Sequence, residues 1–367
     1  MSKNKKILYL FGEGRISRLN NLSESSDEFF YGYDYIKNIY QETSIIEMSS
    51  GKRRPILSLI DKVTRKVTKL AFFFSHIFTL KNTIKIIKSD IVIATNDRIA
   101  LSALPMLLIA KVFSKTKVLV IVMGLLSSEG SPNFIYKYTM KFFLRIVDEF
   151  FFLGKPESEV ASKNYPEHSS KFHFIPFCIN ERFWTINQNL PFQQKNKIAF
   201  VGNDGNREFD KAINIAKSLP NINFIFVTQK IDKKDIPNNV ELISGSWGDN
   251  TITDKEIKKI YGESRFTILP LRETIQPSGQ SVTLQSISCG TPVLISKTKG
   301  FWDADKYINK KNIIFIEDNS LKSWIEEIES IYEEKTMLKA IAKNGISLIH
   351  EEYNKKVFEK ALISFLD

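Results

Sequence analysis

The sequence predicts an α/β protein that is built on parallel, doubly wound sheets and divided into two domains. Short apolar segments rich in Ile, Val and Phe alternate along the chain with longer amphipathic segments. This alternation is typical of sheets whose two faces are covered by helices. The length of 367 residues, 43% of them hydrophobic, suits two cores better than one. A polar, Gln- and Asn-rich stretch at 185–196 is the expected linker.

In the first half, strands are expected at Ile7–Phe11, 90–95, 117–123 and 149–153, and helices at 98–113, bent near Pro105, and at 134–146. Ligands of doubly wound sheets bind beyond the carboxyl ends of the strands. The segments 12–15, 96–98 and 124–129 should therefore share one rim. Three carboxylates on this rim are candidate catalytic bases: Glu13, Asp97 and Glu129.

The second half repeats the pattern. A strand at 197–202 ends in Gly202, and the helix that follows should turn Phe209, Ala212, Ile213 and Ala216 inward. Further strands are expected at 223–228 and 240–243. Two helices, 320–332 and 337–366, should end the chain.

The stretch 268–298 organises this half as a strand, a polar loop, a short helix and a second strand. The loop Pro-Ser-Gly-Gln-Ser at 277–281 precedes the helix, and Cys289-Gly290 ends it. Free N–H groups at a helix N-terminus, approached closely through a glycine, form a natural anion site. An ordinary β-α turn explains the local pattern equally well.

The segments Leu-Gln-Ser-Ile-Ser-Cys-Gly-Thr-Pro-Val at 284–293 and Tyr-Gly-Glu-Ser-Arg-Phe-Thr-Ile-Leu-Pro at 261–270 resemble the donor-binding signature of family-4-like glycosyltransferases. These enzymes have the GT-B fold, which consists of two facing Rossmann-like domains. The segment 174–184 is similar to the end of their first domain. The resemblance implies an acceptor-side domain at 1–190, a nucleotide-sugar domain at 191–345, and a final helix, 346–367, that packs back on the first domain.

The resemblance also implies donor contacts. Relatives place an arginine directly after the first glycine and a lysine a few residues later, and both contact the diphosphate. Asn203 takes the first position here, so Arg207 and Lys211, four apart on one helix face, are the expected replacements. A solvated helix face is the alternative. The full expected donor set is Gly202, Arg207, Lys211, Trp247, Glu273, Ser278, Gly279, Gln280, Ser281 and Gln285.

Two positions depart from the family pattern, in which one glutamate touches the donor sugar and a second binds the ribose. They are Pro277 and Gln285 in this chain. Gln285 can still accept and donate a hydrogen bond, whereas Pro277 can do neither. Glu273 lies four residues before Pro277 on the loop. Catalysis would then depend on the leaving diphosphate, held by the amides of 278–281 and a nearby cation, as in a retaining reaction.

The net charge of +11 requires an anionic partner or surface. Within 52–88, Ile56, Leu59, Ile60, Val63, Val67 and Leu70 recur at helical spacing between Lys and Arg residues, ahead of three phenylalanines at 72–74. Such a helix suits the surface of an anionic membrane. A core helix with a solvated basic face is the alternative. Nucleic acid is the least favoured partner, because no RNA-binding or zinc-finger pattern occurs.

Cys178 and Cys289 give neither a disulfide framework nor metal spacing, and the four histidines are scattered. We therefore expect no metal and no cofactor. The apolar run at 7–11 is too short for a signal peptide, and charges break the apolar region 101–126. The expected location is cytoplasmic, peripheral at the inner face of the membrane.

The sequence thus favours a glycosyltransferase that moves a sugar from a nucleotide-sugar to a glycan or lipid-linked acceptor in cell-surface polysaccharide synthesis. One alternative is a catalytically silent GT-B scaffold or regulator, supported by Pro277 and Gln285. A sugar-nucleotide epimerase is the other, and the missing His and acidic pattern disfavours it.

Overall fold

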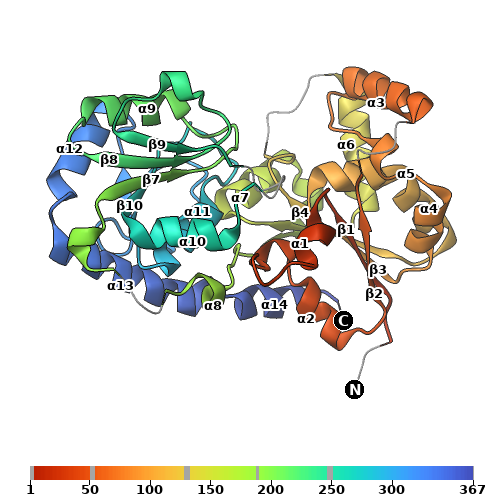
Figure 1. Ribbon diagram of the computed structural model, residues 1–367. Coiled ribbons are helices and arrows are strands. Elements are labelled where there is room, and N and C mark those ends of the chain that lie inside the picture. The colour runs from red at the N-terminus through yellow and green to blue at the C-terminus, as the bar shows by residue number, and fades with distance from the viewer. Residues whose placement is uncertain (1–3, 50–53, 128–132, 187–189, 246–250, 367) are drawn as a thin grey trace. The chain divides into compact units, whose positions relative to one another are not determined.

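The computed structural model describes residues 4–49, 54–127, 133–186, 190–245 and 251–366. Residue contacts divide the chain into two compact units (Figure 1). The first comprises Met1–Asn20, Phe29–Ile175 and Phe358–Asp367, and the second comprises Asn21–Glu28 and Pro176–Val357. The short segment 21–28 therefore packs in the second unit, although the residues before and after it in the sequence belong to the first.

The first unit is built on a parallel sheet with the strand order β2-β1-β3-β4-β5-β6. Its strands are β1 (Ile7–Phe11), β2 (Thr43–Glu47), β3 (Ile91–Ala94), β4 (Lys117–Val122), β5 (Glu149–Phe152) and β6 (Phe172–Phe174). The sequence did not indicate β2, because this edge strand is only partly buried and carries polar residues at both ends.

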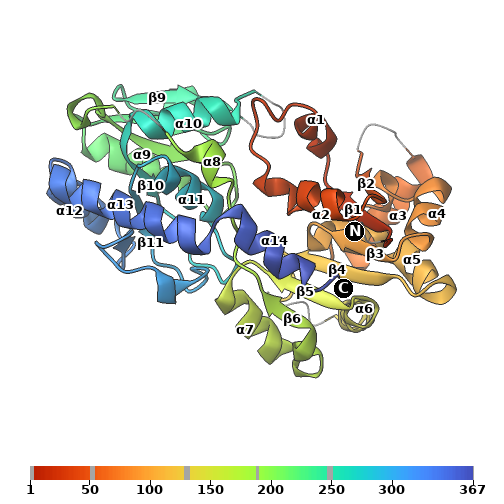
Figure 2. The same cartoon turned by 90° about the horizontal axis from the view of Figure 1, so that it is seen from below.

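Helices cover this sheet, and α7 lies beside β5 and β6 (Figure 2). The helices are α1 (Arg15–Leu19), α2 (Tyr33–Ile39), α3 (Pro55–Thr68), α4 (Leu80–Ile87), α5 (Asp97–Phe113), α6 (Phe134–Ile146), α7 (Lys155–Asn164) and the last part of α14 (Lys355–Ile363). The C-terminal segment belongs to this unit, where the carbonyl of Leu366 accepts a 2.7 Å hydrogen bond from the Lys5 amine.

The second unit repeats the plan with the strand order β12-β11-β10-β7-β8-β9, again parallel throughout. The strands are β7 (Lys197–Val201), β8 (Asn223–Val227), β9 (Val240–Ile243), β10 (Ser264–Leu269), β11 (Val293–Ser296) and β12 (Ile314–Ile316). The helices are α8 (Glu181–Trp184), α9 (Phe209–Ser218), α10 (Asp254–Glu263), α11 (Gln280–Ser288), α12 (Leu321–Ile331) and α13 (Lys335–Glu352). Two parallel six-stranded sheets confirm the expected α/β architecture.

The single helix expected at 337–366 is wrong. The chain leaves the helical path after α13 at Tyr353 and Asn354, and α14 begins at Lys355. Tyr353 is buried, and its hydroxyl donates a 2.8 Å hydrogen bond to Asp303. Asn354 pairs with Ile179. These tertiary contacts replace helical hydrogen bonds that the local sequence would allow.

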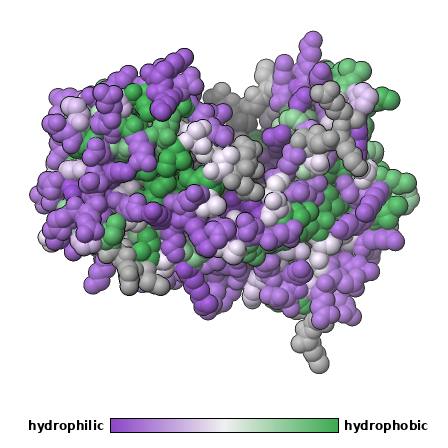
Figure 3. All heavy atoms as spheres, in the orientation of Figure 1, coloured by the Kyte–Doolittle hydropathy of each residue, from purple (hydrophilic) through white to green (hydrophobic). Residues whose placement is uncertain are grey.

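Helix α3 turns its apolar face outward, which contradicts the alternative that this face packs in the core. Ile56, Leu59 and Val63 are 76%, 62% and 55% exposed. The buried side instead carries Asp61, whose carboxylate accepts hydrogen bonds from the backbone of Phe74 and Ser75. At the place of α3, Figure 3 shows green, hydrophobic spheres among purple, hydrophilic ones. Among the described residues, no helix is both long and apolar enough to cross a membrane.

Candidate functional site

Two glycines and one arginine meet at the carboxyl edge of the second sheet. Gly202, directly after β7, has a φ of 145°, and Gly279, which precedes α11, has a φ of 81°. A Cβ atom on Gly202 would lie 2.5 Å from Arg207 Nε, and one on Gly279 would lie 3.5 Å from Arg207 Nη1. Only glycine adopts both backbone conformations cheaply and leaves room for the guanidinium.

The Arg207 guanidinium is buried, with the residue only 2% exposed, and it is not fully paired. Its Nη2 lies 3.3 Å from the Asp204 carboxylate. Nε and Nη1 have no hydrogen-bond partner among the residues that the structure describes. Burial lowers the pKa of Arg207, but arginine titrates so high that it keeps its charge at neutral pH. Buried donors of this kind are costly unless a ligand accepts from them.

Backbone pairing fixes this arginine in place. Arg207 forms an antiparallel bridge with Leu271, the residue that follows Pro270 at the end of β10. The amide of Glu208 donates to the Pro270 carbonyl, and the amide of Arg272 donates to the Asn206 carbonyl, each at 2.9 Å. The backbone of Arg207 is therefore held against the end of β10, so the place from which its side chain starts does not depend on a helix surface.

Helix α11 brings its N-terminus to the same place. The first intrahelical hydrogen bond runs from the Thr283 amide to the Gly279 carbonyl at 2.9 Å, so the amides of 280–282 precede the helical ladder. Ser278 and Gln280 are buried beside the turn, and Ser278 Oγ accepts a 2.7 Å hydrogen bond from Asn206. Amides and guanidinium together form a cradle that can hold an anion.

Lys211 and Glu273 are engaged elsewhere. The Lys211 amine donates to Glu208 and, at 2.6 Å, to the carbonyl of Asn319. Glu273 accepts a 2.8 Å hydrogen bond from the amide of Lys299. The structure does not bring Lys211 against the guanidinium in the way that the helical spacing suggested. Trp247 lies outside the described residues. The donor roles of all three remain predictions.

A buried glutamate lies against Gln285 on α11. Glu28 Oε1 accepts hydrogen bonds from Gln285 Nε2 and from the indole Nε1 of Trp184, both at 2.9 Å, and its Oε2 accepts from Ser26 Oγ. Burial raises the pKa of Glu28 to about 6. The family pattern has a glutamate at position 285. A glutamate there would place a second carboxyl group beside that of Glu28 and would remove the donor of this hydrogen bond. Glutamine supplies the required donor.

Sequence reasoning missed Glu28 because it is 257 positions from Gln285, and its local surroundings, a short polar run at 24–28, carry no recognisable motif. Only the placement of the segment 21–28 in the second unit brings the two side chains together. The amide group of Gln285 is thereby oriented, because Glu28 fixes its Nε2 as the donor.

Two buried carboxyl groups lie near the carboxyl edge of the first sheet. Asp97 accepts from the amides of Met123 and Leu125, both at 3.1 Å, and burial raises its pKa. Glu157 Oε1 accepts from the Gly124 amide at 2.6 Å, and its Oε2 has no partner among the described residues. Burial, with the nearby Asp97 charge adding to it, raises the pKa of Glu157 to about 8.

Glu157 was not among the expected rim carboxylates, although Gly-Lys-Pro-Glu at 154–157 signals a helix start directly after a strand. Of the expected three, Asp97 is buried, and Glu13 is exposed just beyond β1. Glu129 lies outside the described residues. Their catalytic roles remain predictions. Among the described residues, no group of three or more His, Cys, Asp or Glu is arranged to hold a metal ion.

The Glu157→Gln variant should change how stability depends on pH. The folded wild type keeps a proton on Glu157 that the unfolded chain releases between the ordinary pKa of 4.5 and about 8. The contribution of this bound proton to the free energy of unfolding is complete below that window and is lost as the pH rises through it. The free energy of unfolding of Glu157→Gln should therefore rise relative to that of the wild type, by up to about 1.4 kcal/mol for each pH unit in this window. Urea unfolding from pH 5 to 9 measures this, with exposed Glu159→Gln as control. Parallel profiles for the wild type and Glu157→Gln would contradict it.

Two Rossmann-like units, each built on a six-stranded parallel sheet, define the GT-B fold. Solved structures of glycosyltransferases share it. Anabaena HepE in complex with UDP-glucose aligns with a TM-score of 0.70 and 11% identity, covering 99% of each chain. A glycosyltransferase from Rickettsia africae aligns with a TM-score of 0.67 and 13% identity, covering 99% of this chain and 98% of its own.

Sucrose-phosphate synthase from Thermosynechococcus elongatus is similar to the same extent, with a TM-score of 0.67 and 12% identity over 99% of this chain and 98% of that one. No family model and no curated protein matches the sequence. At these identities the likeness establishes the GT-B fold. Function therefore has to be argued from the residues of the site.

Proposed function

We propose that this protein is a glycosyltransferase whose second unit binds the diphosphate of a nucleotide-sugar donor. The observation that carries the proposal is the buried Arg207 guanidinium, with two unpaired nitrogens, between Gly202 and Gly279. An anion at the N-terminus of α11 would accept from these nitrogens and from the helix amides. Because charge develops on the diphosphate as the sugar leaves, the same groups would stabilise the transition state.

Gln285 would contribute to donor binding through its carbonyl oxygen. Glu28 holds the Nε2 of Gln285, which leaves Oε1 as the atom able to accept a ribose hydroxyl. On this proposal the change from glutamate to glutamine keeps the acceptor and gives up only the charge. The first donor to test is UDP-glucose, the ligand bound in the structure of Anabaena HepE.

Catalytic silence is the competing function, and Pro277 favours it because proline offers no group to the donor sugar. Incubating the purified protein with UDP-glucose, with and without an acceptor, and following the release of UDP by NMR separates the two. Hydrolysis or transfer that is lost in an Arg207 variant supports the enzyme. Tight UDP binding without turnover, across a panel of nucleotide-sugars and acceptors, would favour the scaffold.

The product should keep the anomeric configuration of the donor sugar. A retaining reaction of this kind relies on support for the leaving group more than on a side-chain base. Glu13→Gln, an exposed change, should therefore leave substantial activity. NMR of the product formed with a glycan or lipid-linked acceptor identifies the anomer. An inverted product together with an inactive Glu13→Gln enzyme would contradict the proposal.

The acceptor, in this proposal, is a glycan or lipid-linked sugar of cell-surface polysaccharide synthesis, met at the inner face of the membrane. The exposed apolar face of α3 supports membrane contact, because Lys62, Lys66 and Lys69 are exposed on the same segment. Phe134 and Tyr138 on α6, 77% and 75% exposed, add aromatic side chains on a helix that contacts α3.

Binding to anionic vesicles should be weak and sensitive to salt, with about 1 kcal/mol contributed by each Lys or Arg at the surface. Replacing both Ile56 and Leu59 by serine should weaken it at least about tenfold, since each apolar side chain contributes roughly 1.5–3 kcal/mol when buried. Vesicle sedimentation is the measurement. Val112→Ser, at a 70% exposed position on α5, is the control. Equal recovery on neutral and anionic vesicles would exclude this mode of binding.

A further inference from the structure

A cavity lies in the second unit, at the amino ends of the strands. Its volume is about 550 Å³, within the usual range of small-molecule sites. Arg265 and Pro292, which line it, stand at the beginning of β10 and directly before β11. The glycine cradle around Arg207 follows the other, carboxyl ends of the same sheet. The two sites are therefore separated by the length of the strands.

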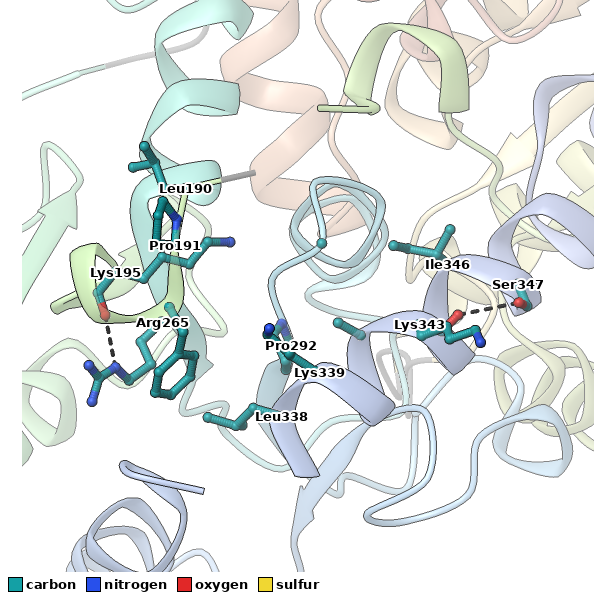
Figure 4. Close-up of a pocket in the computed structure, with 13 residues that line it drawn as sticks. Leu190, Pro191, Lys195, Arg265, Pro292, Leu338, Lys339, Lys343, Ile346 and Ser347 are labelled. Atoms are coloured by element: carbon teal, nitrogen blue, oxygen red, sulfur yellow. Dashed lines mark hydrogen bonds between the residues drawn. The ribbon is translucent and has the colours of Figure 1, made fainter. Parts of the chain in front are cut away.

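The cavity has an apolar wall on two sides. One side is the segment 190–195, and the other is helix α13 (Figure 4). The apolar residues that line it include Leu190, Phe192, Pro292, Leu338, Ala342 and Ile346. Leu338, Ala342 and Ile346 recur every four residues and so form one stripe of α13. A hydrocarbon group would find contacts along this stripe.

The charged residues that line the cavity are all cations: Lys195, Arg265, Lys339 and Lys343. Arg265 is already satisfied. It donates to the carbonyls of Lys195 and Tyr332 at 2.8 and 3.0 Å and to the Glu333 carboxylate at 2.7 Å. The three lysine amines have neither an ion pair nor a hydrogen bond to any part of the chain that the structure describes. Three positive charges thus remain uncompensated.

Lys195 is the unusual member of this group, because it is only 7% exposed. Burial lowers its pKa, and among the described residues the thiol of Cys289 opposes this effect. Burial raises the pKa of Cys289 far above neutral, so that this thiol carries no charge. Figure 4 shows the Lys195 side chain among the residues that line the cavity. A lysine whose side chain is largely buried, with no anion beside its amine, is destabilising, and an acidic ligand would relieve that cost.

We propose that this cavity binds an amphiphilic organic anion, with its acidic group attracted by the lysines that line the cavity and a hydrocarbon body laid on the α13 stripe. The chemistry requires both parts of the ligand. The positive charge of the lysines favours an acid, whereas the apolar wall contributes only when hydrocarbon leaves water. The site is independent of the donor cradle, so its ligand should not compete with UDP.

Calorimetry with the full-length protein tests the proposal with three probes. Dodecanoate below its micelle concentration carries both parts, acetate carries the acid alone, and dodecanol carries the hydrocarbon alone. We expect one dodecanoate per chain and at least about tenfold weaker binding of the other two. Equal affinity for dodecanol and dodecanoate, or several dodecanoate molecules per chain without a distinct tight one, would overturn the proposal.

Variants assign the binding to this cavity. Lys195→Met keeps the length of the side chain and removes its charge, and Lys343→Glu reverses a charge on the exposed surface of α13. Each should weaken dodecanoate binding about tenfold or more. Lys322→Met, an exposed position on α12, and Leu59→Ser on α3 should leave it unchanged. Should Lys195→Met fail to fold, Lys343→Glu decides alone, and unchanged affinity in that variant would refute the assignment.

Discussion

Replacing Arg207 by methionine is expected to weaken the binding of UDP and other nucleoside diphosphates by a factor on the order of 100 or more. Methionine fills much of the buried volume but offers no donor. The guanidinium has two unpaired nitrogens, and each charge-assisted hydrogen bond to a phosphate contributes roughly 1.5–3 kcal/mol. Titration calorimetry of the wild type and Arg207→Met with UDP measures the loss, and turnover of the donor should fall with it.

Stability distinguishes a binding role for Arg207 from a structural one. Among the described residues its one ion-pair partner is Asp204, which is itself half exposed. Removing a buried charge with unsatisfied donors should leave the thermal midpoint without ligand unchanged or raise it. Lys217→Met, an exposed position on α9, the helix that follows Arg207, is the control and should bind UDP normally. Retained UDP binding in Arg207→Met, or a collapse of its stability, would refute the assignment.

The second large effect is expected from Gly279→Val. Position 279 has a φ of 81°, and a Cβ atom there would lie 3.3 Å from Ile295 Cδ1 and 3.4 Å from Leu269 Cδ1. A β-branched residue in this conformation costs about 1–3 kcal/mol, and its methyl groups would occupy the turn where the phosphates approach the α11 amides. UDP affinity should fall at least about tenfold while the fold survives.

Gly205→Ala is the matched control for this change. Gly205 lies in the neighbouring loop, and a Cβ atom there meets nothing within 4 Å. Calorimetry with UDP should give the wild-type affinity for Gly205→Ala, and circular dichroism should show that Gly279→Val remains folded. Wild-type UDP affinity in a folded Gly279→Val protein would exclude the α11 N-terminus as the phosphate site.

The sequence could predict the parts of the site that are adjacent along the chain. The glycine at 279 and the helical pattern that follows predict the loop at 277–281. The position of Gly202 at the end of an apolar strand predicts the turn there. Arg207 was predicted as a helix-face residue, whereas the structure holds it by the bridge to Leu271. Lys211 fits the same helical spacing, but its amine bonds to Glu208 and Asn319.

Amphipathic spacing predicted that α3 is a helix but not which of its faces is covered. The periodicity of Ile56, Leu59 and Val63 is the same whether the stripe meets a core or remains exposed. Asp61 decides the matter through its bonds to the backbone at Phe74 and Ser75. That choice needs the position of a neighbouring segment, which the periodicity of one helix does not contain.

By itself, then, the sequence determined the alternation of strands and helices, the two-unit α/β plan and the position of the glycine turn, because each follows from residues within about one helix or strand length of one another. Only the tertiary structure decided which carboxyl groups are buried and what they touch. Glu28 accepts a hydrogen bond from Gln285, which is 257 positions away in the sequence. Glu157 accepts one from the Gly124 amide, which is 33 positions away. Such partners are selected by packing, and the raised pKa values of both glutamates follow from that burial.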